Sequence, residues 1–250
     1  FVEPVVIDDF LNRYERAGLV LDLASYMVVE GRNQGQYYPD YAYRHPLFSP
    51  GMRIYSDSTV SKFLSSVKDE QIAGFLNDWN TDRDHKSRIY VSYDSTNKNC
   101  QAGDVDFVEF GKAKVDLGLP IFNVGLAMDQ NNRIPLFYEL YPGSINDVSQ
   151  FKFMVDKAVG YGYKNIGFII DRGYFCKANI RYMDEKNYGF VMMVKGCKPL
   201  VCAIIDEHRG TFETRRACSI AGHHIHGTTV KRKLFPDDER ERYLHLFFSP

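Results

Sequence analysis

The chain has 250 residues, of which 44% are hydrophobic and 25% charged, and its formal net charge is −1. This length and composition predict a globular protein with one sizeable domain, or a core domain with an appendage. No apolar run approaches the roughly 20 residues of a membrane span, and the near-neutral charge argues against a uniformly basic nucleic-acid binder.

The N-terminal residues and the cysteine content indicate a cytoplasmic protein. Residues 1–4 have neither the basic start nor the apolar core of a signal peptide. The cysteines are odd in number and irregularly spaced, so they predict neither a disulfide framework nor a zinc site. They are Cys100, Cys176, Cys197, Cys202 and Cys218. We therefore expect reduced thiols, a cytoplasmic location and no membrane partner.

Residues 1–87 predict a mostly helical N-terminal region. Residues 1–50 mix short apolar runs with Tyr, Pro and Gly, and the tyrosine-rich stretch 36–43 indicates a loop. Helical periodicity begins after Ser56, a good helix cap, and a second helix is predicted over 69–79. Two short helices could form a DNA-binding unit, although packing alone is the commoner explanation.

Residues 88–195 predict a mixed α/β core. Alternating or continuous apolar residues predict strands over 89–94, 121–128, 134–140, 166–170 and 189–194. The second and third strands are joined by a turn-rich connection that is typical of a hairpin. Helices are predicted after the Asn146-Asp147 cap and over 176–186. The order strand, hairpin, helix, strand, helix, strand predicts a mixed sheet with flanking helices, as in the ribonuclease-H-like fold.

Two aspartates stand at the ends of predicted strands and are the main candidates for a functional site. Asp94 follows the run 89–93, and Asp171 follows the run 166–170. Buried strands normally exclude carboxylates, because an ionised group loses several kcal/mol of hydration unless a cation or hydrogen-bond donors replace the water. If the two strands are parallel neighbours, both carboxylates face the same crevice at their carboxyl ends.

Carboxylate oxygens are ligands that suit Mg²⁺ or Mn²⁺ better than zinc. A pair of such ions can hold the attacking and leaving oxygens of a phosphodiester in line. The alternative is that Asp94 caps a turn at Ser95-Thr96 and that Asp171 pairs with Arg172. For either aspartate alone that alternative is the commoner arrangement, whereas the two together favour a shared cation site.

Basic residues are concentrated in the segment 195–235, which has eight Lys or Arg against three acids. A local positive charge beside acid-bearing strands is consistent with a phosphate-backbone ligand, although a solvated polar face explains it equally well. The candidate phosphate contacts are Arg172 and Lys195, which flank the predicted site, and the run Lys231, Arg232 and Lys233.

Four short motifs, taken together and in this order, resemble those of DDE transposases. They are Tyr93-Asp94-Ser95-Thr96, Gly125-Leu126-Ala127-Met128-Asp129, Pro142-Gly143-Ser144-Ile145-Asn146-Asp147 and Asp171-Arg172-Gly173-Tyr174. The most similar group is the bacterial insertion-sequence type, whose ribonuclease-H-like domain carries an insertion. The resemblance covers roughly residues 88–195 and, less securely, the helical stretch from Ser56.

This resemblance implies cleavage of DNA at element ends and transfer of the freed 3′ hydroxyl to a target strand. It implies three acidic residues, Mg²⁺ (or Mn²⁺) as cofactor, and action as a homodimer on paired ends. Asp94 and Asp171 correspond to the first and second acids and are 77 residues apart. Both are expected to be catalytic and metal-binding.

The family's third acid has no counterpart that we identify in this sequence. It is a glutamate within a Tyr…Arg…Glu…Lys signature, and no tyrosine here is followed by Arg three residues on and Glu four beyond. Glu239 and Glu241 instead lie in a charged run that indicates a helical surface. In related proteins a mainly β insertion precedes the glutamate helix, so residues 196–250 are expected to be part of that insertion.

The sequence therefore predicts a transposase fragment that lacks the glutamate helix and is inactive alone. The absent initiator Met and the abrupt end at Pro250 favour the same interpretation. Two alternatives stay open, a non-catalytic DNA-binding remnant of a transposase and a different ribonuclease-H-like nuclease.

Several other polar residues have simpler structural interpretations. His223, His224 and His226 resemble a metal cluster by type but lack partners at zinc spacing, so a surface loop is favoured. Asp147 is more simply a helix cap than a ligand. Tyr174 could stack on a base, although packing against the sheet is the commoner arrangement.

Overall fold

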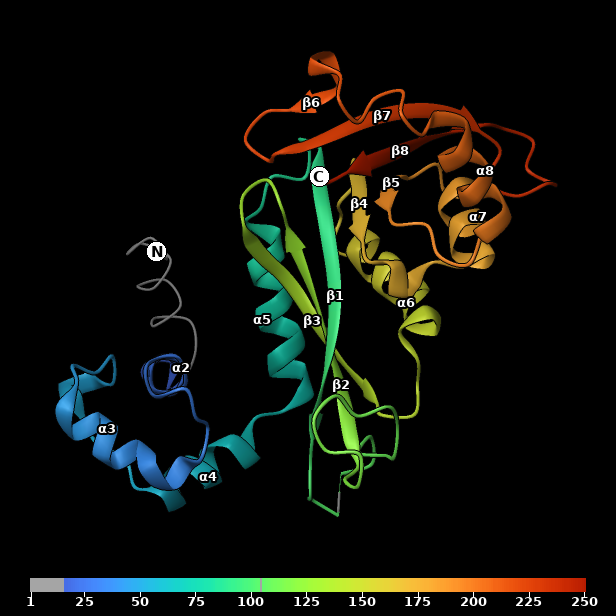
Figure 1. Cartoon of the computed structure of the whole chain (residues 1–250). Coiled ribbons are helices and arrows are strands. Elements are labelled where there is room, and N and C mark those ends of the chain that lie inside the picture. The colour runs from blue at the N-terminus through green and yellow to red at the C-terminus, as the bar shows by residue number, and fades with distance from the viewer. Residues whose placement is uncertain (1–15, 104) are drawn as a thin grey trace. The chain divides into compact units, whose positions relative to one another are not determined.

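The computed structural model describes residues 16–103 and 105–250, which separate into two compact units divided between Asp78 and Trp79 (Figure 1). Residues 1–15, with the start considered above for a signal peptide, lie outside the described residues. The predicted boundaries at 87 and 195 stay predictions. No helix in the described ranges combines the length and apolar character that crossing a bilayer requires.

The first unit is helical over its described residues, as the sequence predicts. Its helices are α2 (Ala17–Glu30), α3 (Tyr38–Arg44) and α4 (Asp57–Ser66), with short 3-10 turns η1 (Gly35–Tyr37) and η2 (Pro50–Met52). The cap predicted at Ser56 is present, because its hydroxyl accepts a hydrogen bond from the Thr59 amide at 3.3 Å. The cap satisfies one of the amides that the first turn leaves without a partner.

The tyrosine-rich stretch that the sequence indicates as a loop instead forms helix α3. Pro39 lies in its first turn, where proline costs no hydrogen bond. Tyr38 and Tyr41 are only 0% and 3% exposed and pack with Tyr26 of α2. Burial of large aromatic rings against α2 therefore outweighs the weak helical pattern of the local sequence.

The second unit is built on a five-stranded mixed sheet. Its strands are β1 (Ile89–Asn99), β2 (Ile121–Asp129), β3 (Ile134–Pro142), β4 (Ile166–Ile170) and β5 (Gly189–Met192). The order across the sheet is β3-β2-β1-β4-β5. The first three strands are antiparallel neighbours, whereas β4 and β5 run parallel to β1. This arrangement is the predicted ribonuclease-H-like mixed sheet.

Helices around this sheet bury apolar side chains against it. They are α6 (Asp147–Gly160) and α7 (Lys177–Glu185), and the turn η3 (Arg172–Tyr174) precedes α7. Helix α5 (Asp69–Thr81) spans the division between the two units. The α6 positions Phe151, Met154 and Val155 are each 0% exposed. At the end of α5, the Trp79 indole donates to the Pro135 carbonyl oxygen at 2.7 Å, which fixes this helix end on strand β3.

The C-terminal segment forms a second, antiparallel sheet of three strands with one helix. Helix α8 (Lys198–His208) and the turn η4 (Arg216–Cys218) precede β6 (Ser219–Ile220), β7 (Ile225–Arg232) and β8 (Arg242–Phe248), in the order β6-β7-β8. The mainly β character predicted for this segment is confirmed. The helical surface expected at Glu239 and Glu241 is not present, because these residues lie in the turn between β7 and β8.

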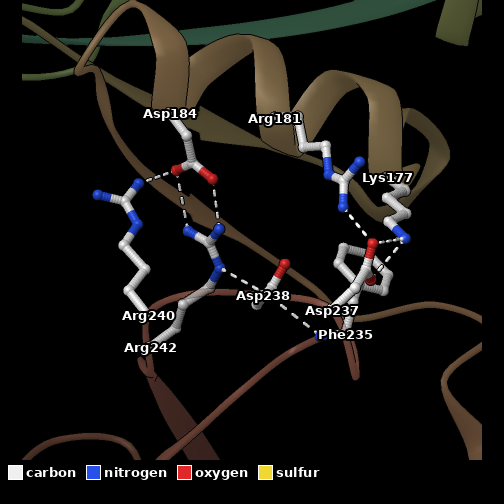
Figure 2. Close-up of polar contacts among 8 residues, drawn as sticks. All are labelled: Lys177, Arg181, Asp184, Phe235, Asp237, Asp238, Arg240 and Arg242. Carbon is white, nitrogen blue, oxygen red and sulfur yellow. Dashed lines mark hydrogen bonds and ion pairs between the residues drawn. The ribbon is translucent and has the colours of Figure 1, made fainter.

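The turn between β7 and β8 is fixed to helix α7 by ion pairs, which Figure 2 shows. The Asp237 carboxylate accepts hydrogen bonds from Lys177 at 2.6 and 2.7 Å and from Arg181. All three side chains are about half exposed, so water and salt weaken this part of the contact. These pairs join two segments that are about 60 residues apart in the sequence.

A second, less exposed group of ion pairs lies at the other end of α7. Asp184 accepts from Arg240 and from both terminal nitrogens of Arg242 (Figure 2). The side chains of Arg242 and Asp184 are only 13% and 21% exposed. Two-point contact of a guanidinium with a carboxylate fixes orientation as well as distance. We infer that the ion pairs of Asp184 hold the turn to α7 more firmly than those of Asp237, and we call these two groups the Asp184 anchor and the Asp237 anchor.

The Asp237 anchor predicts that acid weakens the attachment of the turn to α7. Hydrogen bonds from Lys177, and then from Arg181, lower the pKa of Asp237 from its ordinary 3.8 to about 2. Because the pKa is depressed, the contribution is complete above about pH 4 and is lost as the pH falls through about 2. Hydrogen-exchange protection of residues 235–242, corrected for intrinsic rates, should fall between pH 4 and pH 2.

Asp237→Asn is the matched variant for this experiment. It should show reduced protection of residues 235–242 already at pH 4 and a smaller further loss on acidification than the wild type. Protection of strand β1 serves as the control for global unfolding. Equal protection of the turn in the wild type at pH 4 and pH 2 would contradict the prediction.

Candidate metal and catalytic site

Strand register brings Asp94 and Asp171 together at one place in the sheet. The parallel pairing of β1 with β4 ends at the partners Tyr93 and Ile170. Asp94 and Asp171 are the next residues of the two chains, immediately beyond this last pair. Neighbouring strands lie about 4.8 Å apart, and both aspartates are exposed. The predicted juxtaposition is therefore supported by the pairing itself.

The surroundings of Asp94 differ in two respects from the sequence-based expectation. Strand β1 does not end at Asp94 but continues to Asn99, because β2 pairs with it as far as the partners Asn99 and Ile121. The aspartates are also solvent-exposed rather than buried. The Asp94 carboxylate accepts from the Ser95 amide at 2.8 Å, within a strand and not within the turn considered as the alternative.

Asp171 lies at the start of the short turn η3. Its carboxylate accepts from the Gly173 amide at 3.2 Å, which caps the turn. Among the described residues it forms no ion pair with Arg172, so the simple pairing considered as an alternative is absent. Tyr174, at the end of the turn, is only 2% exposed. This residue packs in the core, as the commoner of its two interpretations predicted.

The glycine of the second motif has a packing role beneath the first aspartate. Tyr93 is 2% exposed and points to the face opposite Asp94, because side chains alternate along a strand. A Cβ atom on Gly125 of β2 would lie 2.0 Å from the Tyr93 hydroxyl oxygen. The Tyr93 ring therefore occupies the space in which any side chain at position 125 would lie.

The third motif forms the junction between β3 and α6. A Cβ atom on Gly143 would lie 2.3 Å from the Ile121 carbonyl oxygen, so only glycine permits this close backbone contact. The α6 cap is Asn146, whose side chain accepts from the Ser149 amide at 3.0 Å. Asp147 begins the helix and accepts from the Tyr141 hydroxyl at 2.7 Å, so the cap is its neighbour and not Asp147 itself.

The candidate basic residues fall into two groups. Arg172 and Lys195 are exposed and follow the carboxyl ends of the neighbouring strands β4 and β5. Lys231, Arg232 and Lys233 lie on or just after β7, in the second sheet. Arg232 donates to both carboxylate oxygens of Glu207 at 2.9 and 3.0 Å, whereas Lys231 and Lys233 are exposed. Arg172 and Lys195 therefore follow strands of the sheet that carries the acids, whereas the β7 group lies in the second sheet.

The carboxylates of Asp94 and Asp171 provide hard oxygen donors of the kind that Mg²⁺ and Mn²⁺ prefer. The described residues contain no group of three or more His, Cys, Asp or Glu side chains arranged to hold a metal ion. The pair thus fits as two ligands of an incomplete site. His223 and His224 lie in the β6–β7 turn, as expected for a surface loop, whereas His226 lies in strand β7 and not in a loop. All five cysteines are unbonded.

Two features of this region were not anticipated from the sequence. One is the hydrogen bond between Tyr141 and Asp147, and the other is the contact between Tyr93 and Gly125. Both join residues that are distant in sequence or lie on different elements. The motifs contain Tyr93, Gly125 and Asp147, but not Tyr141, and no local periodicity signals which side chain meets which.

The family model described as "Transposase DDE domain" matches residues 93–240, more than half of the chain. The protein therefore belongs to the DDE transposase domain family. The match begins one residue before Asp94 and includes all four motifs. Among curated protein sequences, none matches this chain.

Solved structures of nucleic-acid enzymes are similar to the chain at low identity. A cryo-EM structure of the piggyBac transposase synaptic complex with hairpin DNA matches 94% of this chain, at 10% identity and a TM-score of 0.43. The chain spans 52% of that protein's length. The Mos1 strand transfer complex matches 78% of this chain and 64% of its own, at 14% identity and a TM-score of 0.29. Ciona intestinalis Endonuclease V in complex with an inosine-containing DNA matches 71% and 82%, at 11% identity and a TM-score of 0.29.

The contact between Tyr93 and Gly125 predicts the effect of a single added methyl group. Gly125→Ala should reduce the free energy of unfolding by about 1–3 kcal/mol, because the Tyr93 ring must shift within a packed core. Chemical denaturation measures the loss. Gly103→Ala is the control, since no atom lies within 4 Å of its added Cβ. A Gly125→Ala protein as stable as this control would contradict the packing.

Proposed function

We propose that this protein is the metal-dependent catalytic region of a DNA transposase, of the bacterial insertion-sequence type. Its proposed reaction is cleavage at element ends followed by transfer of the freed 3′ hydroxyl to target DNA. The observation that carries this proposal is the register of β1 and β4, which leaves Asp94 and Asp171 side by side beyond the partners Tyr93 and Ile170. Membership of the DDE family supports the same assignment.

Asp94 and Asp171 are proposed to be the first and second acids of the catalytic triad and to hold Mg²⁺ or Mn²⁺. The chemistry that a bound divalent cation supplies is activation of a water or hydroxyl nucleophile and neutralisation of charge on the leaving oxygen. The protein's own contribution is the position of the two carboxylates. Both are exposed, so a phosphodiester can approach them without unfolding of the sheet.

Arg172 and Lys195 are the proposed contacts to the DNA backbone next to the acids. Arg172 directly follows Asp171, and Lys195 follows β5, the neighbour of β4. Their charges offset the repulsion between a phosphate and the two carboxylates. Lys231, Arg232 and Lys233 are proposed to contact phosphates farther from the acids. For Arg232 this contact would have to replace or share its ion pair with Glu207.

The third acid is proposed to come from outside the 250 residues, because no Tyr…Arg…Glu…Lys signature occurs within them. The isolated chain should then bind cations weakly and show no strand transfer. The full protein is proposed to act as a homodimer on paired ends.

The missing signature equally supports a second candidate function, a DNA-binding remnant of a transposase without catalytic activity. Reading the gene beyond Pro250 separates them: an open frame with the signature supports the enzyme, and a stop codon supports the remnant.

The first test concerns the acids in the full-length protein. Asp94→Asn and Asp171→Asn should each abolish Mg²⁺-dependent cleavage of element-end DNA while leaving the circular dichroism spectrum and unfolding midpoint nearly unchanged. Asparagine keeps the size of the side chain but removes the charge that holds the cation. Asp206→Asn, an exposed change on α8, is the control and should keep wild-type cleavage. Cleavage retained by either site variant would show that the site is misplaced.

The second test concerns the basic residues. Arg172→Ala and Lys195→Ala should each weaken DNA binding at low salt and reduce the slope of log affinity against log salt by about 1, as expected for one lost phosphate contact. Fluorescence anisotropy at several salt concentrations measures both quantities. Lys62→Ala, on α4 in the first unit, provides the comparison. An unchanged slope in both variants would exclude these residues as backbone contacts.

A further inference from the structure

Two buried tyrosines connect the segments that carry the two acids. Tyr93 is the residue immediately before Asp94, and Tyr174 ends the turn that begins after Asp171. Their rings are in contact, with centroids 5.5 Å apart and an interplanar angle of 61°. Each side chain is 2% exposed. The contact lies beneath the sheet, on the face away from the Asp94 carboxylate.

The Tyr93 ring is fixed from a second direction by strand β2. The backbone of Gly125 leaves room for the ring, whose hydroxyl oxygen and Cζ lie 2.0 and 2.5 Å from where a Cβ would be. An aromatic ring that covers a glycine of the neighbouring strand is a known means of holding a sheet's register. The Tyr93 ring therefore contacts both Gly125 of β2 and the Tyr174 ring.

The turn that follows Asp171 is held by its own backbone hydrogen bonds, by the Asn179 side chain, which donates to the Tyr174 carbonyl oxygen at 3.0 Å, and by the buried Tyr174 ring. It is a three-residue 3-10 turn, a conformation with weak hydrogen-bond geometry. Arg172 is exposed, and Gly173 has no side chain. Tyr174 is the buried side chain of this turn, and it also packs on Phe151 of α6 with centroids 6.0 Å apart. The β1–β4 pairing aligns the strands as far as Ile170, and the Tyr174 ring is a buried contact that holds the segment just after Asp171.

The hydroxyl groups of the two tyrosines do not explain their burial. Neither the Tyr93 nor the Tyr174 hydroxyl has a hydrogen-bond partner within the described residues. Burial raises the pKa of Tyr174 above its ordinary value by more than the nearby Ser95 side chain lowers it, so the phenol stays neutral. A buried hydroxyl without a partner costs stability. We therefore infer that Tyr93 and Tyr174 contribute through the packing of their aromatic rings and not through hydrogen bonds of their hydroxyl groups.

We propose that Tyr93 and Tyr174 are positioning residues that set the spacing of the Asp94 and Asp171 carboxylates for a divalent cation. The inference rests on the proposed function, since it assigns a role to residues that support the same site. Ligand geometry must be held to within about 0.5 Å for tight binding, and loss of supporting contacts typically weakens metal affinity by 10–100-fold. The ring contact joins the two acid-bearing segments on this face, in addition to the strand pairing of Tyr93 with Ile170.

The experiment measures Mn²⁺ binding to the 250-residue chain, by the paramagnetic broadening of amide resonances around residues 94 and 171. Tyr174→Leu should raise the apparent Mn²⁺ dissociation constant at least about tenfold. Tyr174→Phe and Tyr93→Phe keep the ring and remove only the unpartnered hydroxyl, so each should bind Mn²⁺ within twofold of the wild type. Wild-type Mn²⁺ affinity in the phenylalanine variants, with weaker affinity in Tyr174→Leu, would show that the ring and not the hydroxyl group is required.

Phe137→Leu is the control for a merely structural role. Phe137 lies on β3, is as buried as Tyr174 at 2%, and packs on Tyr161 rather than on an acid-bearing segment. This variant should lose stability to a comparable extent but bind Mn²⁺ within twofold of the wild type. All titrations are made well below the unfolding midpoint of each variant, which thermal unfolding establishes.

The outcomes distinguish failure of this inference from failure of the proposed function. If Asp94→Asn abolishes the broadening but Tyr174→Leu binds Mn²⁺ as tightly as the wild type, the tyrosines do not position the site. If Phe137→Leu weakens binding as much as Tyr174→Leu, the effect is general and the inference also falls. If the wild type shows no Mn²⁺ broadening near residues 94 and 171, both the site and the inference are wrong.

Discussion

The parallel pairing of β1 with β4 is the interaction on which the rest of the site depends. It joins two strands whose aspartates are 77 residues apart in the sequence. Five consecutive pairs, from Ile89 with Ile166 to Tyr93 with Ile170, set the alignment. A slip of one residue would turn one aspartate toward the core, since the side-chain period of a strand is two. The buried faces of both strands make such a slip costly, and hydrophobic burial therefore determines which polar groups meet.

The two faces of the sheet differ in character: one carries packed aromatic side chains and the other carries the exposed carboxylates. On one face, Tyr174 packs against both Tyr93 and Phe151, and the two tyrosine hydroxyls have no hydrogen-bond partner among the described residues. On the other, Asp94 and Asp171 remain in water. Exposed carboxylates keep their hydration, so folding of the sheet does not require a bound cation. This separation explains how a strand can carry an acid next to a fully packed core, and why the acids of such a site can be replaced without loss of the fold.

Helix α7 both follows the turn after Asp171 and holds the turn between β7 and β8. It begins six residues after Asp171, directly beyond the turn that carries the second acid. Its outer face holds the turn between β7 and β8 through Asp184, Lys177 and Arg181. The second sheet is therefore attached to the same helix that follows the site. The half-exposed pairs at Asp237 are screened by water and salt, whereas the pair of Asp184 with Arg242 is more enclosed.

Much of this protein follows from its sequence alone. Alternating and continuous apolar runs predict the five strands of the main sheet, the caps at Ser56 and Asn146 predict two helices, and the order of elements predicts the mixed sheet, because these signals are local. The aspartates and the four motifs likewise identify the DDE family. Tertiary structure decided what depends on contacts between distant residues. Pairing with β2 extends β1 beyond Asp94, aromatic burial turns the stretch at Tyr38 into a helix, and ion pairs to α7 hold residues near Glu239 in a turn. Only packing in three dimensions brings Tyr93 onto Gly125 and Tyr174, since no local pattern in a sequence specifies which distant side chain fills a given space.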